Sequence, residues 1–193
     1  MAIYDFSKKG TEDFLYVYSP IVKSYPQFEK KNGYLVNRYD DDNKDFEYIS
    51  IVTKKTYTKA KITVECDFDK YGAPLIVWGG DISEKQGNDG EAHLFYGVHF
   101  EAVAWEKGLN LWYIVPFPER KEHPVKPTKL LGAEFPIESG SRIIMSAEIE
   151  KGKATITVNG KSFTVKCDEM PQSFHVGYTA CEGINRLYRM EIE

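Results

Sequence analysis

The segment from residue 94 to residue 112 holds the side chains with the most varied chemistry in this sequence. In an extended strand, successive side chains point to opposite faces of the sheet. Counting alternate residues, one face of the first predicted strand carries Phe95, His99, Glu101, Val103 and Trp105. The residues between them are mostly apolar, and this alternation is typical of a strand with one buried face.

A hairpin extends this face onto a second predicted strand. The segment Glu106-Lys107-Gly108 is a turn signal, and after it apolar residues alternate with Asn110, Trp112 and Ile114. An imidazole, a carboxylate, an amide and two indole rings therefore share one face. A pyranose has an apolar C–H face and a rim of hydroxyls, so this combination predicts a surface that binds a carbohydrate or a similar polyhydroxylated ligand.

In this hypothesis each residue type has a separate task. Trp105 and Trp112 stack on C–H faces of the ligand, while polar side chains bind its hydroxyls, and these are His99, Glu101 and Asn110. The structural alternative is that His99 bonds to a neighbouring strand and that Glu101 forms a cross-strand ion pair.

A second polar group lies at the bend between the last two predicted strands. Glu182, Asn185 and Arg186 border the same groove if this last hairpin belongs to the same sheet. The alternative is a turn that is held by its own side chains.

The rest of the chain predicts an all-β protein. Residues 142–166 form an expected three-stranded antiparallel meander, with Asn159-Gly160 as a type I′ turn. Residues 174–192 form an expected hairpin that closes the sheet. Further strands are expected at residues 3–6, 14–18, 34–37 and 46–52, with long loops at 81–91 and 117–129. A length of 193 residues suits one β-sandwich domain, residues 1–193.

Composition limits the partners and cofactors. The formal net charge is only −4 with both signs interspersed, so neither nucleic acid nor an anionic membrane surface is an expected partner. No run approaches the roughly 18 apolar residues that span a bilayer, and the first residues lack a signal-peptide pattern. We therefore expect a cytoplasmic protein, although a secreted chain trimmed of its signal peptide would have the same features.

No cofactor or metal is expected either. The three cysteines have no Cys-x-x-Cys spacing, which argues against a zinc or redox site, and Cys66 alternates with apolar residues as a buried side chain would. The acidic stretch at residues 40–45 resembles the start of a calcium loop. However, Phe46 replaces the required Gly and Val52 replaces the bidentate Glu, so an acidic hairpin loop is favoured.

The pattern of about a dozen antiparallel strands resembles the concanavalin A-like lectin and glucanase superfamily. The late meander around residues 158–161 and the last segment through Val176-Gly177-Tyr178 carry this resemblance. It implies a two-sheet antiparallel jelly-roll β-sandwich, with carbohydrate bound on the concave sheet or at its loops. Both enzymes and non-catalytic binders share this fold, so the resemblance does not decide activity.

Retaining glucanases of this superfamily carry Glu-x-Asp-x-x-Glu on a concave-face strand, and here Glu101 and Glu106 match the two glutamates. The resemblance implies Glu101 as nucleophile and Glu106 as acid/base, but Val103 replaces the central Asp that helps to separate their pKa values. A carbohydrate binder is thus the first hypothesis and a retaining glycoside hydrolase the second. The third is an interaction module whose aromatic face packs against another subunit, as in a homo-oligomer.

Overall fold

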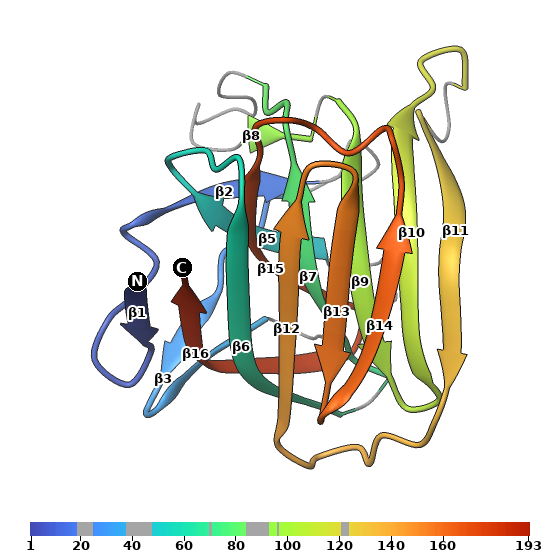
Figure 1. The fold of residues 1–193 in the computed structure, drawn as a ribbon. Helices are drawn as coiled ribbons and strands as arrows, with labels where there is room; N and C mark the ends of the chain where they lie inside the picture. Colours follow the sequence, from blue (N-terminus) through green and yellow to red (C-terminus); the bar gives the residue numbers. More distant parts are fainter. Residues whose placement is uncertain (19–24, 38–47, 70, 84–92, 96, 121–123) are drawn as a thin grey trace.

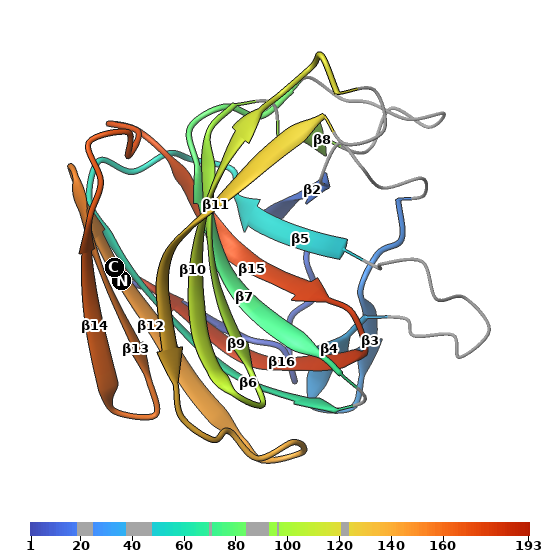
Figure 2. The ribbon, with the colours of Figure 1, turned by 90° about the vertical axis from the view of Figure 1, so that its right-hand side faces the viewer.

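The computed structural model describes residues 1–18, 25–37, 48–69, 71–83, 93–95, 97–120 and 124–193, and all statements below concern these residues. They form strands and turns, arranged as two layered sheets (Figures 1 and 2). The described chain contains no helix of the length and apolarity needed to cross a membrane.

The first layer, which we call the back sheet, contains the predicted meander. Its strand order is β14 (Lys161–Lys166), β13 (Lys153–Val158), β12 (Ile143–Glu150), β6 (Ala60–Asp69), β16 (Ile184–Ile192), β4 (Tyr34–Val36) and β3 (Glu29–Lys31), with β1 (Ala2–Asp5) also paired to β16. Asn159 and Gly160 both have positive φ, 46° and 81°, as the predicted turn requires. The meander prediction is therefore confirmed.

The second layer, the front sheet, contains the predicted hairpin, but its first strand begins at His99 and not at Leu94, which lies in a separate short strand paired with residues 17–18. Its order is β11 (Val125–Glu134), β10 (Gly108–Pro116), β9 (His99–Trp105), β7 (Ala73–Gly79), β15 (His175–Cys181), β5 (Tyr48–Thr53), β2 (Phe14–Tyr18) and β8 (His93–Leu94). All neighbours are antiparallel except β2 and β8, which run parallel. The prediction of a two-sheet antiparallel β-sandwich is confirmed.

The core lies between the two sheets, and β9 and β10 contribute to it as predicted. Phe100, Ala102, Ala104, Leu109 and Leu111 are all fully buried there. In β7, whose sequence is apolar on both faces, Trp78 points into this core and its ring stacks on Phe100 at 5.3 Å between centroids. The even-numbered residues of β9 thus face the core, while the odd-numbered residues face away from the back sheet.

Two predicted features need correction. The strands β15 and β16 do not pair with each other: β15 lies in the front sheet between β7 and β5, whereas β16 lies in the back sheet between β6 and β4. The residues between them, Glu182 and Gly183, both have positive φ and form a corner that carries the chain from one sheet to the other. The last segment is therefore a crossover and not a hairpin.

The second correction concerns the predicted loop at 117–129. Its second half belongs to β11, which pairs with β10 along the whole length of that strand. This strand contains Pro127 and three charged residues, Lys126, Lys129 and Glu134, a composition that hides its extended conformation. Because β11 is an edge strand, Pro127 and the charges are tolerated there.

Candidate functional site

The outer face of the front sheet, which we call the open face, carries the predicted site residues of β9 and β10. Strand register aligns side chains into rows across this face. One row consists of Leu15, Val52, Gly177, Val77, Glu101, Trp112 and Lys129, in order from β2 to β11. Leu15 at the β2 end is half-buried and Val52 and Val77 are fully buried, and from there exposure rises through half-buried Trp112 to exposed Lys129. The accessible part of the open face therefore lies over β9, β10 and β11.

Three predicted side chains share this accessible part. Trp112 lies opposite Glu101, Asn110 lies opposite Val103, and Trp105 ends β9 next to the hairpin turn. All three are half-buried, so each keeps surface for a ligand. Trp112 lies opposite Glu101, and Trp105 follows Glu101 by four positions along β9. The backbone positions of the two indoles are therefore about 13 Å apart along the strands. Asn110 lies between them.

Two lysines lie over these indoles. The Nζ atom of Lys129 is 5.0 Å from the ring centroid of Trp112, and that of Lys107 is 5.6 Å from the ring centroid of Trp105. These distances are in the range of cation–π contacts. A Cβ added at Gly132 would lie 3.4 Å from Asn110 Oδ1 and 3.9 Å from Lys129 Nζ, so these two polar groups flank the same exposed glycine.

Beneath this surface, three polar side chains bind one another. The Tyr48 hydroxyl donates to Glu101 Oε1, and His99 Nε2 lies 3.2 Å from the same oxygen. His99 is 2% exposed and Glu101 8%. Burial, and next the neighbouring Glu101 carboxylate, raise the pKa of Tyr48 well above its usual value, so the phenol remains a donor. Oε1 of Glu101 is thus already bound by two groups of the protein.

Phe95, which precedes β9, covers the middle of the open face. Phe95 packs with Val17, Val52 and Val77, which come from three different strands, and its ring stacks on His99 at 4.3 Å between centroids. This contact explains why His99, which lies on the predicted face, is buried. The predicted groove is therefore filled at its centre and accessible only toward β11.

The two glutamates of the glucanase-like motif are not brought together. Pairing of β9 with β10 is regular from His99 to Trp105, and Glu106 is an exposed residue of the hairpin turn. The Glu101 carboxylate is buried and bound to Tyr48 and His99, whereas Glu106 is exposed beyond the end of the strand, with its Cα about 16 Å from that of Glu101. Retaining hydrolysis needs its two carboxyl groups about 5–5.5 Å apart. The geometry of this pair does not meet that requirement.

The predicted polar residues at the bend between β15 and β16 do not join the residues of β9 and β10 on the open face. Glu182, Asn185 and Arg186 were expected to border the same groove if the last hairpin belonged to the same sheet. That condition is not met, because Asn185 and Arg186 lie in β16 of the back sheet and Glu182 lies at the corner before it. Asn185 is fully buried and its amide donates to the Glu182 carbonyl at 2.7 Å, so it holds the corner. Arg186 pairs with Asp67 at 2.7 Å and Asp69 at 2.8 Å on the outer face of the back sheet.

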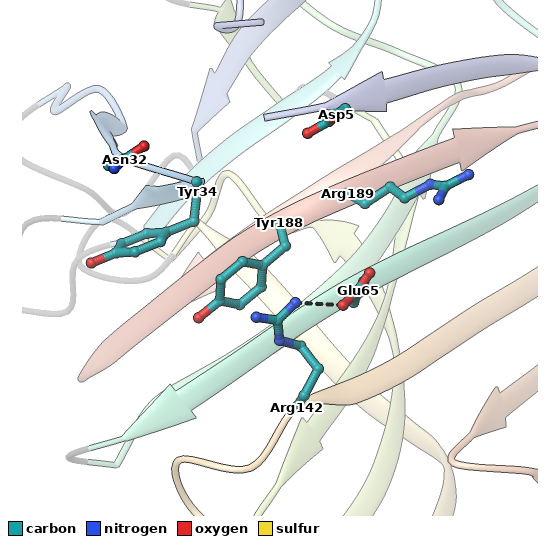
Figure 3. A pocket seen from close by; sticks show the side chains of 8 residues that line it. Asp5, Asn32, Tyr34, Glu65, Arg142, Tyr188 and Arg189 are labelled. Carbon is teal, nitrogen blue, oxygen red and sulfur yellow. Dashed lines mark hydrogen bonds and ion pairs between the residues drawn. The ribbon is translucent and has the colours of Figure 1, made fainter. Parts of the chain in front are cut away.

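A hollow of about 520 Å³ lies near this arginine on the outer face of the back sheet (Figure 3). The residues that line it are Asp5, Asn32, Gly33, Tyr34, Glu65, Arg142, Tyr188 and Arg189.

Its polar groups are largely bound to each other. The Arg142 guanidinium pairs with Glu65 and packs 3.3 Å from the ring centroid of Tyr188, whose hydroxyl donates to Asp67 at 2.5 Å. Burial, and next the bond to Asp67, raise the pKa of Tyr188 to about 12. The Arg142 and Tyr188 side chains in this hollow are thus already bound to other residues of the protein. We therefore locate the candidate site on the open face.

No group of three or more His, Cys, Asp or Glu side chains among the described residues is placed to hold a metal ion. The acidic stretch at 40–45 lies outside the described residues. Cys66 is fully buried as predicted, and burial, followed by the Asp67 charge, raises the pKa of its thiol.

No protein-family model and no curated protein sequence matches this chain. Solved structures do resemble it along its whole length. A glycoside hydrolase family 16 endo-glucanase from Bacteroides ovatus superimposes with a TM-score of 0.62 at 12% identity, covering 100% of this chain and 99% of that chain. The fold is that of the concanavalin A-like jelly rolls. The resemblance predicted from the sequence is confirmed at the level of the fold.

Proteins named for carbohydrate binding have the same fold. The carbohydrate binding module CBM66 from Bacillus subtilis has a TM-score of 0.54 at 9% identity, over 83% of this chain and 91% of its own. The exoplasmic domain of VIP36, in a form bound to Ca²⁺ and Man3GlcNAc, has a TM-score of 0.57 at 10% identity, over 92% and 86%. Hydrolases and binders thus share this fold, and the choice between them depends on the residues of this chain.

The sequence interpretation missed two residues of the site. Tyr48 falls in the predicted strand at 46–52, but nothing local indicates that its hydroxyl reaches Glu101 across two intervening strands, β15 and β7. Lys129 was assigned to a loop, and only its pairing with Trp112 places it at the site. Both depend on strand order, which local alternation does not contain.

Proposed function

We propose that this protein binds carbohydrate non-catalytically on the accessible part of the open face. The observation that carries the proposal is the arrangement of Trp105, Asn110 and Trp112, two half-exposed indoles with an amide between them. Indoles stack on the C–H faces of sugar rings, and the amide can both donate to and accept from hydroxyls. The separation of the indoles along the strands suits an oligosaccharide better than a single ring.

In this proposal Glu101 and His99 do not contact the ligand but stabilise the strands that carry the indoles. Glu101 lies directly opposite Trp112, and its bonds to Tyr48 and His99 fix the strand segment that carries the indole. The placement of Glu106 in the turn favours a binder over the retaining hydrolase. Release of reducing sugar from β-glucans, abolished by Glu101→Gln, would contradict this choice and support the hydrolase.

Replacing Trp112 by Ala tests the proposal directly. We expect glycan binding to weaken by about tenfold to a hundredfold, because a stacking ring is lost from the surface while the core stays intact. A glycan array followed by titration calorimetry measures this effect. Tyr71→Ala is the matched control, because it removes an aromatic ring that is 83% exposed at another place in the fold.

The competing interpretation is that the indoles form an interface between copies of this chain. In that case light scattering would give a mass above 22.1 kDa that falls to the monomer value in Trp112→Ala. A monomeric wild type together with glycan binding that depends on Trp112 supports the proposal. An array on which no glycan binds contradicts it.

A further inference from the structure

The two lysines of the open face lie beside the indoles of the proposed site. Six described lysines form ion pairs with carboxylates, and these are Lys8, Lys9, Lys31, Lys59, Lys61 and Lys153. Lys107 and Lys129 have no acidic partner within the described residues, and the group near each ammonium is an indole ring. Other described lysines, for example Lys151 and Lys161, also lack an ion pair with a described carboxylate, so the feature that needs an explanation is the position of Lys107 and Lys129 beside two half-exposed indoles.

The acidic groups around the two lysines decide which one leaves net positive charge. Glu101, in the same row as Lys129, is buried and lies two strands away, about 10 Å across the sheet, so it forms no ion pair with that lysine. Near Lys107, by contrast, Glu106 is exposed in the same turn and Glu134 lies opposite Gly108. The uncompensated cation of the accessible surface is therefore Lys129, beside Trp112 and Asn110.

An ammonium over an indole affects different ligands in opposite ways. A neutral sugar that stacks on Trp112 must move the Lys129 ammonium, which is 5.0 Å from the ring centroid, and loses the cation–π contact. A sugar with an anionic substituent gives that ammonium a new and stronger partner, because ion pairs and charge-assisted hydrogen bonds exceed neutral ones. The long, flexible lysine side chain can make this exchange without movement of the backbone.

We propose that the ligand of the open face is an anionic glycan, with carboxylate or sulfate groups that bind Lys129 while a sugar ring contacts Trp112. This inference rests on the proposed function and adds to it the chemical class of the ligand. Asn110, on the other side of Gly132, binds a hydroxyl of the same or the next sugar ring. Lys129 is thus the residue that determines specificity.

The test compares three oligosaccharide probes of similar length by titration calorimetry at two salt concentrations. The probes are an oligogalacturonate, which carries carboxylates, a κ-carrageenan oligosaccharide, which carries sulfates, and a neutral β-glucan oligosaccharide. We expect at least one anionic probe to bind about tenfold more tightly than the neutral one, with an affinity that falls as salt rises. The anionic probe that binds more tightly shows whether the site prefers a carboxylate or a sulfate group.

Lys129→Gln supplies the matched variant. We expect it to reduce binding of the anionic probe by about tenfold and to leave neutral binding unchanged or slightly tighter. Lys161→Gln is the control, since Lys161 also lies over an aromatic ring, Phe135 at 4.5 Å, but on the last strand of the back sheet. Lys129 is exposed at the sheet edge, so both variants should fold, which circular dichroism checks.

The outcomes separate this inference from the proposed function. If the neutral probe binds as tightly as the anionic ones and depends on Trp112 but not on Lys129, the anionic class is wrong and carbohydrate binding stands. If none of the probes binds and a broad array also shows no binding, both proposals are wrong. Equal losses in Lys129→Gln and Lys161→Gln would show a general charge effect and would also overturn the role of Lys129.

Discussion

Replacing Gly177 by Ala is expected to unfold the protein or to lower its stability by more than about 4 kcal/mol, a cost typical of severe backbone strain. A Cβ at this position would lie 1.9 Å from the carbonyl oxygen of Ile51 and 2.7 Å from the Cα of Val52. These are backbone atoms of β5, so no side chain can rotate away. The strands β15 and β5 would have to separate in the middle of the front sheet.

The matched control is Gly132→Ala in β11 of the same sheet. There the nearest atom to the added Cβ is the Asn110 side-chain oxygen at 3.4 Å, which is ordinary contact. We expect a change within about 1 kcal/mol, because alanine costs little at an exposed strand position. Urea unfolding followed by tryptophan fluorescence measures both variants. A Gly177→Ala protein as stable as the wild type would contradict the close approach of β15 and β5.

The alternation of residues along the chain was enough to predict which side of β9 and β10 faces the core. It works there because one face is fully apolar and the other carries mixed residues, so only one register buries the apolar face. The turn at Asn159-Gly160 was equally predictable, since these two residue types tolerate positive φ. Where the residues of a segment alone select its conformation, that conformation can be predicted from the sequence.

The misplaced features all depend on contacts between distant segments. The crossover at Glu182 and Gly183 has the length and composition of a hairpin turn, and only the sheet assignment of β15 and β16 distinguishes the two. The covering of His99 by Phe95 depends on a path across three other strands. Period-two alternation contains no information about such paths, so it predicted an open groove where the structure has a partly filled one.

This partial filling has a consequence for the site. Apolar packing around Val52, Val77 and Phe95 makes one half of the open face a second small core, and Phe95 also stacks on His99 of β9. Trp105 projects from the same strand, which is therefore packed on its outer side at His99 as well as on its core side. Packing of this kind limits movement of the strand, and a surface that moves less binds with less loss of conformational entropy.

Raising the pH above about 10 is expected to destabilise the protein steeply, because buried phenols must remain neutral in the folded state. Burial is the largest cause that raises the pKa of both Tyr48 and Tyr178 well above the usual value of 10, followed by Glu101 for Tyr48 and Cys66 for Tyr178. Their stabilising effect is fully present below the pKa of the unfolded chain. Above it the unfolded chain loses protons that the folded protein keeps, so stability falls by about 1.4 kcal/mol per pH unit for each group.

Tyr178→Phe tests this pH dependence at a single position. The Tyr178 hydroxyl is buried and has no hydrogen-bond partner among the described residues, so its removal should leave stability at pH 7 unchanged or slightly higher. Above pH 10 the variant should lose stability more slowly than the wild type, by about 1.4 kcal/mol per pH unit. Urea unfolding at half-unit pH intervals gives both slopes, with Tyr71→Phe as the exposed control. Equal alkaline slopes for the wild type and Tyr178→Phe would show that this phenol ionises as readily in the folded state as in the unfolded chain.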